Sequence, residues 1–295
     1  MKKRTLIASF RHFLVGFSMG AADLVPGVSG GTIAFVSGIY EQLLSAVEIV
    51  TGPVLRLVIR GKFVQAYRMT PFKFVVPLGL GMAIAILSLS HLIEYLLADH
   101  PNQTWSFFFG LVVASIVLVG RTIKGWSWRE LVAIAAGALT TYWMVGAVPL
   151  ETPATPLAFF FSGMVAICAM ILPGISGSFI LVLLGKYSQV LHAVSDRDIL
   201  TILYVGLGAV VGLSVFSRLL KYLLDKHHSV TLGVLFGVLI GSLRKVWPWK
   251  LPDGTNILPE LSGEVLLALF CAIIGAVLVL GISQLERGKR SIVTE

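Results

Sequence analysis

The stretch DLVPGVSGGT at positions 23–32 decides the fold, because it interrupts apolar sequence with helix-breaking residues and carries a single charge. Proline lacks a backbone N–H and ends an incoming helix, whereas glycine permits a sharp chain reversal at little steric cost. Ser29 stands where the outgoing helix needs an N-cap. A loop in water is usually more polar, so the pattern predicts a break between two helices at membrane depth.

A second copy of the break occurs later in the chain, where PGISGS at 173–178 repeats PGVSGG at 26–31. The same offset relates three further pairs: Gly38 and Gly185, Tyr40 and Tyr187, and Gln42 and Gln189. A second, shorter offset relates two more: Gly79–Gly81 and Gly206–Gly208, and Phe109–Gly110 and Phe236–Gly237. The constant order predicts a duplicated chain with halves 1–150 and 151–295. The difference between the two offsets predicts an extra basic loop within about 50–73 of the first half.

The composition indicates that lipid is the solvent of this chain. Its 295 residues are 56% hydrophobic and 13% charged, about half the charge of a typical soluble domain. Alternating strands of a transmembrane barrel are absent from the sequence, so the apolar runs predict helices. There are ten such runs, at about 7–22, 29–50, 72–97, 105–120, 131–148, 156–171, 175–195, 200–223, 230–243 and 263–284.

Positive charge is divided unevenly between the two sides of the membrane. With the N-terminus in the cytoplasm, 18 of the 23 Lys and Arg fall in cytoplasmic segments, as the positive-inside rule requires. The stretch Arg244–Lys250 runs against this bias. We expect both termini in the cytoplasm. The net charge of +8 then reflects loop topology, with attraction to anionic lipid headgroups as an alternative, and it predicts no nucleic-acid partner.

Each half holds five apolar segments, an odd number, so the second half must be inverted in the membrane. We therefore expect an all-α polytopic membrane protein with an inverted-topology repeat, an architecture common among transporters. Each half begins with a re-entrant helical hairpin, at about 7–50 and 156–195, and continues with three spans, which gives about six spanning helices. The alternative is ten ordinary spans packed through small residues. The low polarity and duplication of the two tips favour re-entrance.

The two breaks predict a site for an anion. Helix N-termini present free N–H groups and the positive end of the helix dipole, and two such ends that meet near the midplane suit a phosphate or carboxylate. The candidate headgroup residues are Ser29, Gly30, Gly31, Thr32, Ser176, Gly177 and Ser178. The candidate breaks are Pro26, Gly27, Pro173 and Gly174.

Four charged residues are further candidates. Asp23 and Glu41 are acidic residues of the first hairpin and candidates for a coupling group or a cavity charge, since ionisable groups within a membrane are usually functional. Met170 occupies the place of Asp23 in the second half. The alternative for Asp23 is a turn residue satisfied by nearby backbone N–H groups. Arg121 and Arg218 are possible phosphate clamps, or cations that extend to the headgroups.

Enzymatic and metal chemistry leave no pattern in this sequence. The six histidines lack metal-ligand spacing, and neither a nucleophile elbow nor a phosphate-binding loop occurs. We expect no metal, no cofactor and no catalytic residue.

The segment DLVPGVSGGTIAFVSGIYE at 23–41, with PGISGSF at 173–179, resembles the polyprenyl-phosphate (undecaprenyl phosphate) transporter family, long catalogued as a family of unknown function. The second tip departs from the first, with Ser178 in the place of Gly31. The resemblance implies translocation of undecaprenyl phosphate, the lipid carrier of cell-wall glycan synthesis, from the outer to the inner leaflet of the bacterial cytoplasmic membrane. The functional interpretation of Asp23 as a coupling group predicts, separately, that transport is coupled to protons or sodium.

Two alternative functions stay open. The first is a transporter or channel for a small soluble anion, and the second is a membrane enzyme that acts on lipid phosphates. The sequence gives no oligomeric state.

Overall fold

The computed structural model describes residues 2–25, 27–121, 127–147, 152–251, 254–259 and 263–290. Within these ranges every regular element is a helix, apart from an isolated bridge between Lys250 and Asn256. This confirms the all-α prediction.

The first half begins with a long helix, a break and two shorter helices. Its elements are α1 (Lys2–Asp23), α2 (Gly30–Val36), α3 (Tyr40–Ile49), the π-helix η1 (Val50–Val54), α4 (Leu55–Ile59), α5 (Phe63–Met69), α6 (Phe72–Asp99), α7 (Pro101–Gly120) and α8 (Trp128–Val145). The second half repeats this order without the middle insertion. It comprises α9 (Pro156–Ile171), α10 (Gly177–Leu183), α11 (Tyr187–Ser195), α12 (Ile199–Lys226), α13 (His228–Val246) and α14 (Gly263–Arg290).

The helix bounds reproduce the two offsets found in the sequence. The separation in sequence between the two breaks is also the separation between the starts of α2 and α10. The shorter separation, found between Gly79–Gly81 and Gly206–Gly208, relates α6 to α12 at both of their ends. The turns after α6 and α12 also have the same polar contacts, because the hydroxyls of Thr104 and Thr231 each lie within hydrogen-bond distance of two carbonyl oxygens of the preceding turn and can donate to either. In the second turn these carbonyls belong to Leu223 and His227.

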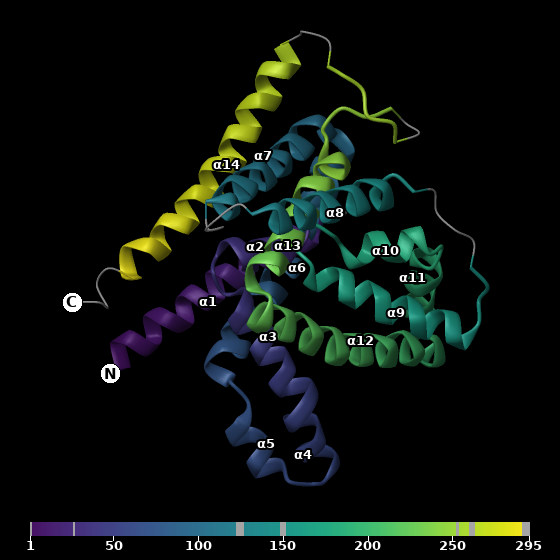
Figure 1. Cartoon of the computed structure of the whole chain (residues 1–295). Coiled ribbons are helices and arrows are strands. Elements are labelled where there is room, and N and C mark those ends of the chain that lie inside the picture. Colours follow the sequence, from purple (N-terminus) through teal and green to yellow (C-terminus); the bar gives the residue numbers. More distant parts are fainter. Residues whose placement is uncertain are drawn as a thin grey trace.

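The insertion in the first half is helical, so the prediction of a basic loop within 50–73 was wrong. Helix α3 continues through η1 and α4 to Ile59, and α5 follows after a short turn. The wide turns of η1 accommodate Pro53, which has no backbone N–H to donate. Helices α4 and α5 extend away from the rest of the molecule (Figure 1).

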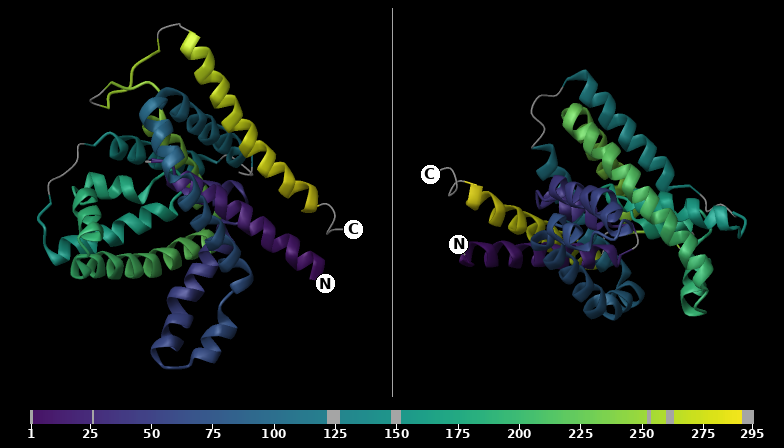
Figure 2. Two further views of the ribbon diagram at one scale, coloured as in Figure 1. Left: turned by 180° about the vertical axis from the view of Figure 1, so that it is seen from behind. Right: turned by 90° about the horizontal axis from the view of Figure 1, so that it is seen from below.

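The two halves interleave. Within each half the incoming hairpin helix packs on the long span, α1 on α6 and α9 on α12, whereas between halves α7 packs on α14 and α8 on α13. Figure 2 shows α8 beside α13 from below. Close approach depends on matched glycines: a Cβ on Gly81 or on Gly208 would stand 2.1 Å or 1.9 Å from a backbone oxygen of the partner helix. The boundary near residue 150 stays a prediction, since residues 148–151 lie outside the described residues.

In the described residues, six helical segments are long and apolar enough to cross a membrane: Tyr40–Ile59, Phe72–Asp99, Pro101–Gly120, Ile199–Lys226, His228–Val246 and Gly263–Gly281. Five of them are predicted spans. The remaining predicted span, α8, has Arg129 and Glu130 in its first turn and is not one of these six segments, and Tyr40–Ile59 takes its place in the count. The outgoing arm of the second hairpin, Gly177–Leu183 with Tyr187–Ser195, is bent by 109°. Such a bend is expected of a re-entrant or broken span. The protein is therefore a multi-pass membrane protein.

Candidate anion site at the hairpin tips

In the tip of the first hairpin, residues 23–32, several backbone N–H groups donate within the protein. Gly27 reverses the chain at φ 93°, a conformation that side chains disfavour. Ser29 is the N-cap of α2 and accepts from Gly31 N at 3.0 Å. Asp23 Oδ1 accepts from Gly30 N at 2.7 Å. A carboxylate of the chain itself thus occupies the end of this helix, which is the alternative that the sequence had offered for Asp23.

The tip of the second hairpin, residues 170–178, has the same turn and fewer internal bonds. Gly174 has φ 92°, and Ser176 holds the N-cap position of α10. The Ser176 side chain makes no capping bond, because its hydroxyl lies 2.7 Å from the hydroxyl of Ser178. Gly177 and Ser178 are only partly buried, so this tip is the more open one.

The two tips touch each other, as the inverted hairpins predict. Ser29 Oγ lies 3.2 Å from the carbonyl oxygens of both Met170 and Leu172, and can donate to one of them at a time. Gly174 N donates to Thr32 Oγ1 at 2.9 Å. These bonds join residues from opposite halves of the chain, so the contact is built by the fold.

The first tip is closed to solvent in this conformation. Ser29 and Thr32 are fully buried, and Val25 and Val28 belong to the main hydrophobic core. A phosphate could reach Gly30 or Gly31 only after Asp23 or the opposite tip moved. The headgroup role of Ser29–Thr32 and Ser176–Ser178 stays a prediction, now with the condition that the tips separate.

A basic cavity of about 560 Å³ lies beside the second tip, between α8, α10, the end of α13 and the loop that follows it. Its wall includes Phe179 and Val182 from α10 and three cations, Arg244, Lys245 and Lys250. Sequence reasoning did not name these cations as site residues. The signal was present, because this stretch is the exception to the cytoplasmic bias of positive charge.

Lys245 connects both tips to this cavity. Its stem packs on the first tip, where a Cβ added to Gly27 would stand 2.5 Å from Lys245 Cγ. Its ammonium Nζ lies 4.5 Å from the centre of the Phe179 ring, on the second hairpin. Glycine at position 27 is therefore required twice, by the backbone angle and by this side chain.

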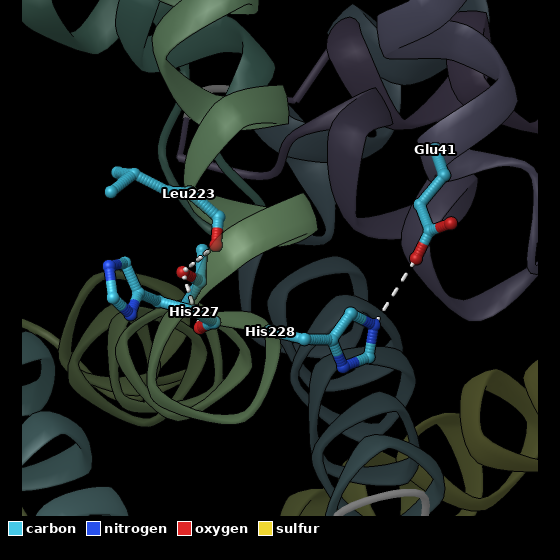
Figure 3. A network of polar contacts seen from close by, with 5 residues as sticks. Glu41, Leu223, His227 and His228 are labelled. Atoms are coloured by element: carbon cyan, nitrogen blue, oxygen red, sulfur yellow. Dashed lines mark hydrogen bonds and ion pairs between the residues drawn. The ribbon is translucent and has the colours of Figure 1, made fainter.

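The remaining predicted charges lie apart from the tip contact. Glu41 is exposed and its carboxylate lies 3.4 Å from His228 Nε2, at the junction of α3 and α13 (Figure 3). Arg121 is exposed at the end of α7. Arg218 is exposed on α12 with its guanidinium against Gly52. Their functional roles stay predictions. Of the predicted breaks, Pro173 is buried at the second tip and Pro26 lies outside the described residues.

Metal binding finds no support in the described part of the chain, where no three His, Cys, Asp or Glu side chains are grouped to hold an ion. The absence of a cofactor stays a prediction.

Long apolar helices and two broken hairpins whose tips meet beside a basic cavity define a multi-pass membrane protein of the discontinuous-helix kind. Residues 19–258 match the family described as undecaprenyl phosphate translocase-like. The chain belongs to this family, as its two PG-x-SG motifs had indicated.

Two relatives extend this comparison. The polyprenyl-phosphate transporter of Vibrio cholerae is 42% identical over 238 residues, which cover 81% of this chain and 77% of the relative. The polyprenyl-phosphate transporter of Staphylococcus aureus is 32% identical over 255 residues, which cover 80% of this chain and 86% of the relative. No solved structure matches the chain.

Proposed function

We propose that this protein moves undecaprenyl phosphate from the outer to the inner leaflet of the bacterial cytoplasmic membrane, and so returns the carrier for cell-envelope synthesis. The observation that carries the proposal is the direct contact of two hairpin tips beside a cavity lined by three cations. The names of the two relatives support the same substrate class.

The substrate has a headgroup that cannot cross hydrocarbon unaided. A phosphate monoester carries about −1.5 to −2 charges at neutral pH, and an unpaired charge in an apolar medium is costly. The cations of the cavity, the serine hydroxyls and the N–H groups of the tips can replace its water. The isoprenoid chain needs no such path, because it can stay in lipid while the headgroup moves.

Movement of one half against the other would open the site first to one leaflet and then to the other. The tip contact consists of packing and two bonds at any one time, one donated by Ser29 and one accepted by Thr32, and this small contact must break for a headgroup to pass between the hairpins. We place both termini in the cytoplasm. The first residues of α1 and the last residues of α14 lie on one side of the molecule in both views, which agrees with this topology (Figures 1 and 2).

The test is the amount of undecaprenyl phosphate exposed on the outer leaflet of cells with and without the protein. Loss of the protein should enlarge the outer pool, and its return on a plasmid should restore the original value. An unchanged pool would remove the proposal. The amount of the protein in the membrane of the complemented cells is measured in parallel and compared with that in wild-type cells, so that poor expression is not mistaken for inactivity.

A soluble anion is the second candidate substrate, because the wall of the cavity is mostly polar and would accept inorganic phosphate. Proteoliposomes distinguish the two substrates. Uptake of radioactive inorganic phosphate would favour the soluble anion, whereas a leaflet exchange of lipid phosphate without phosphate uptake would favour the lipid.

A further inference from the structure

The cavity formed by Tyr142, Phe179, Arg244, Lys245 and Lys250, which we call the basic cavity, is lined by three cations and, among the residues that the structure describes, by no carboxylate. We propose that it binds a phosphate monoester and is the place where the headgroup of the lipid first docks from the outer side. This inference rests on the proposed function and names the docking site for that substrate.

The three cations contact neutral groups. Arg244 donates to the Tyr142 carbonyl at 3.0 Å and lies over the Tyr142 ring. Lys245 lies over Phe179, and Lys250 lies 4.3 Å from the centre of the Trp105 ring while it donates to the Lys245 carbonyl. Among the residues that the structure describes, no carboxylate forms an ion pair with any of the three.

This arrangement is costly without an anion. All three side chains are partly buried, and charges withdrawn from water need a counter-charge or they destabilise the fold. Burial, and secondly the charge of Lys245, lower the pKa of the Lys250 ammonium to about 8. A bound phosphate would supply the missing negative charge. The contact of each cation with an aromatic ring contributes a small favourable free energy and keeps the cation in position. Such a contact does not use the N–H donors, which can therefore bind a ligand.

Two of the cations are present in only one half of the duplicated framework. By the second offset, the positions of the first half that are equivalent to Arg244 and Lys245 are Val117 and Leu118. With the proposed topology, the basic cavity therefore opens on the outer side and has no equivalent of these two cations on the inner side. A docking site for a substrate that arrives from the outer leaflet needs this asymmetry.

The basic cavity also has the dimensions and contacts for a headgroup. A volume of about 560 Å³ holds a phosphate with water but not a long isoprenoid chain. Asn256 adds an amide to the wall. Because Lys245 touches both Gly27 and Phe179, a phosphate that draws its ammonium away from the Phe179 ring would loosen the link between the two hairpins. Binding at the cavity is thereby connected to opening of the tips.

The test measures binding of farnesyl phosphate, a soluble polyprenyl monophosphate, to the purified full-length protein in detergent, by calorimetry. The double variant Lys245→Met/Lys250→Gln removes both charges and keeps an unbranched side chain at each position. We expect its Kd for farnesyl phosphate to rise at least about tenfold. The matched control Arg60→Gln/Lys62→Gln removes two exposed charges near α4 and should bind as the wild type does. An unchanged Kd in the first variant would overturn the inference.

Two further ligands identify what is recognised. Farnesol lacks the phosphate and should not bind the basic cavity, and binding as tight as that of farnesyl phosphate would contradict the inference. Inorganic phosphate should compete weakly with farnesyl phosphate. Equal affinity for the two would assign the cavity to free phosphate and overturn its role in docking the lipid.

A measurement on the wild type removes the dependence on variants that fail to fold. Farnesyl phosphate should slow the acetylation of Lys250, followed by mass spectrometry, and leave that of the exposed Lys62 unchanged. Equal rates with and without the ligand would overturn the inference. Two outcomes separate the docking role from the proposed function. If the double variant loses binding of farnesyl phosphate and still transports the lipid, the docking role is wrong and the proposed function stands. If the wild type binds farnesyl phosphate and leaves the outer pool of lipid phosphate unchanged, the proposed function is wrong.

Discussion

The two hairpin tips have the same backbone and different chemistry. Gly27 and Gly174 have φ angles of 93° and 92°, and each is followed by a serine at the N-cap position of a short helix, α2 or α10. Yet the first tip is closed by Asp23 and by the Ser29 cap, whereas the second has methionine in place of the aspartate and a serine that does not cap. The two copies therefore share the backbone geometry of the turn. Asp23 and Ser29 hold the first tip by hydrogen bonds that the second tip lacks, so we regard the first tip as fixed and the second as open.

The largest effect is expected where the tips are in contact. A Cβ on Gly31 would stand 2.8 Å from the Ile171 oxygen, so Gly31→Ser must push the tips apart and should abolish transport. The equivalent residue of the second tip is already Ser178, and Ser178→Gly should keep most of the activity. Transport is measured as the outer-leaflet pool of undecaprenyl phosphate. Equal losses of transport in the two variants would show that both tips depend to the same extent on the residue at this position.

Asp23 offers the next test. Asparagine can still accept from Gly30 N, so Asp23→Asn removes the charge and keeps the cap, and we expect transport to fall about tenfold with expression intact. Asp23→Ala removes the cap as well and should also lower the amount of folded protein.

Full activity of Asp23→Asn would mean that the carboxylate only closes the helix end. In that case, proton or sodium coupling would have to depend on another group. Transport driven by a proton gradient and by a sodium gradient, measured separately in proteoliposomes, shows which ion the wild type uses.

The sequence predicted the duplication and the breaks well, because glycine, proline and serine have local conformational effects that do not depend on distant partners. The matching bounds of α6 and α12 confirm this. The insertion after Ile49 was predicted as a loop because its charges resemble those of a cytoplasmic connection. A π-helix that accommodates Pro53 continues the helix there, and sequence periodicity does not reveal such a wide turn.

The site was predicted in part. Contact of the two tips follows from inverted hairpins, but the occupation of Gly30 N by Asp23 depends on side-chain geometry that only the fold provides. The basic cavity is assembled from α8, α10 and the end of α13, which are far apart in the chain. Its trace in the sequence was the group of cations on the outer side, and this departure from the charge bias is the most useful signal that was left unused.

A pH titration separates the basic cavity from the tips. Lys250 has a pKa of about 8, so it is charged and can bind phosphate below that pH and loses its proton above it. A phosphate monoester stays mostly dianionic above neutral pH, because its second pKa is about 6. Lys245 is the other lysine in the wall of the cavity.

We therefore expect the Kd for farnesyl phosphate to rise above a pH of about 8, by up to about tenfold per pH unit. Lys250→Arg should remove this dependence and keep tight binding at neutral pH. If Lys250→Arg had the same pH profile as the wild type, the titrating group would lie elsewhere, with Lys245 as the next residue to replace.

The smallest expected effect concerns the two N-cap serines and is the most direct comparison of the tips. Ser29→Ala removes the bond to Gly31 N and the contacts with the Met170 and Leu172 carbonyls, so it should lower stability by about 1 kcal/mol or somewhat more. Ser176→Ala removes only the contact with Ser178, which is partly exposed, and should leave stability within about 0.5 kcal/mol. The midpoint of thermal unfolding in detergent measures both. If both variants lost the same stability, the second tip would have to be capped in solution, and the first tip could no longer be considered the fixed one.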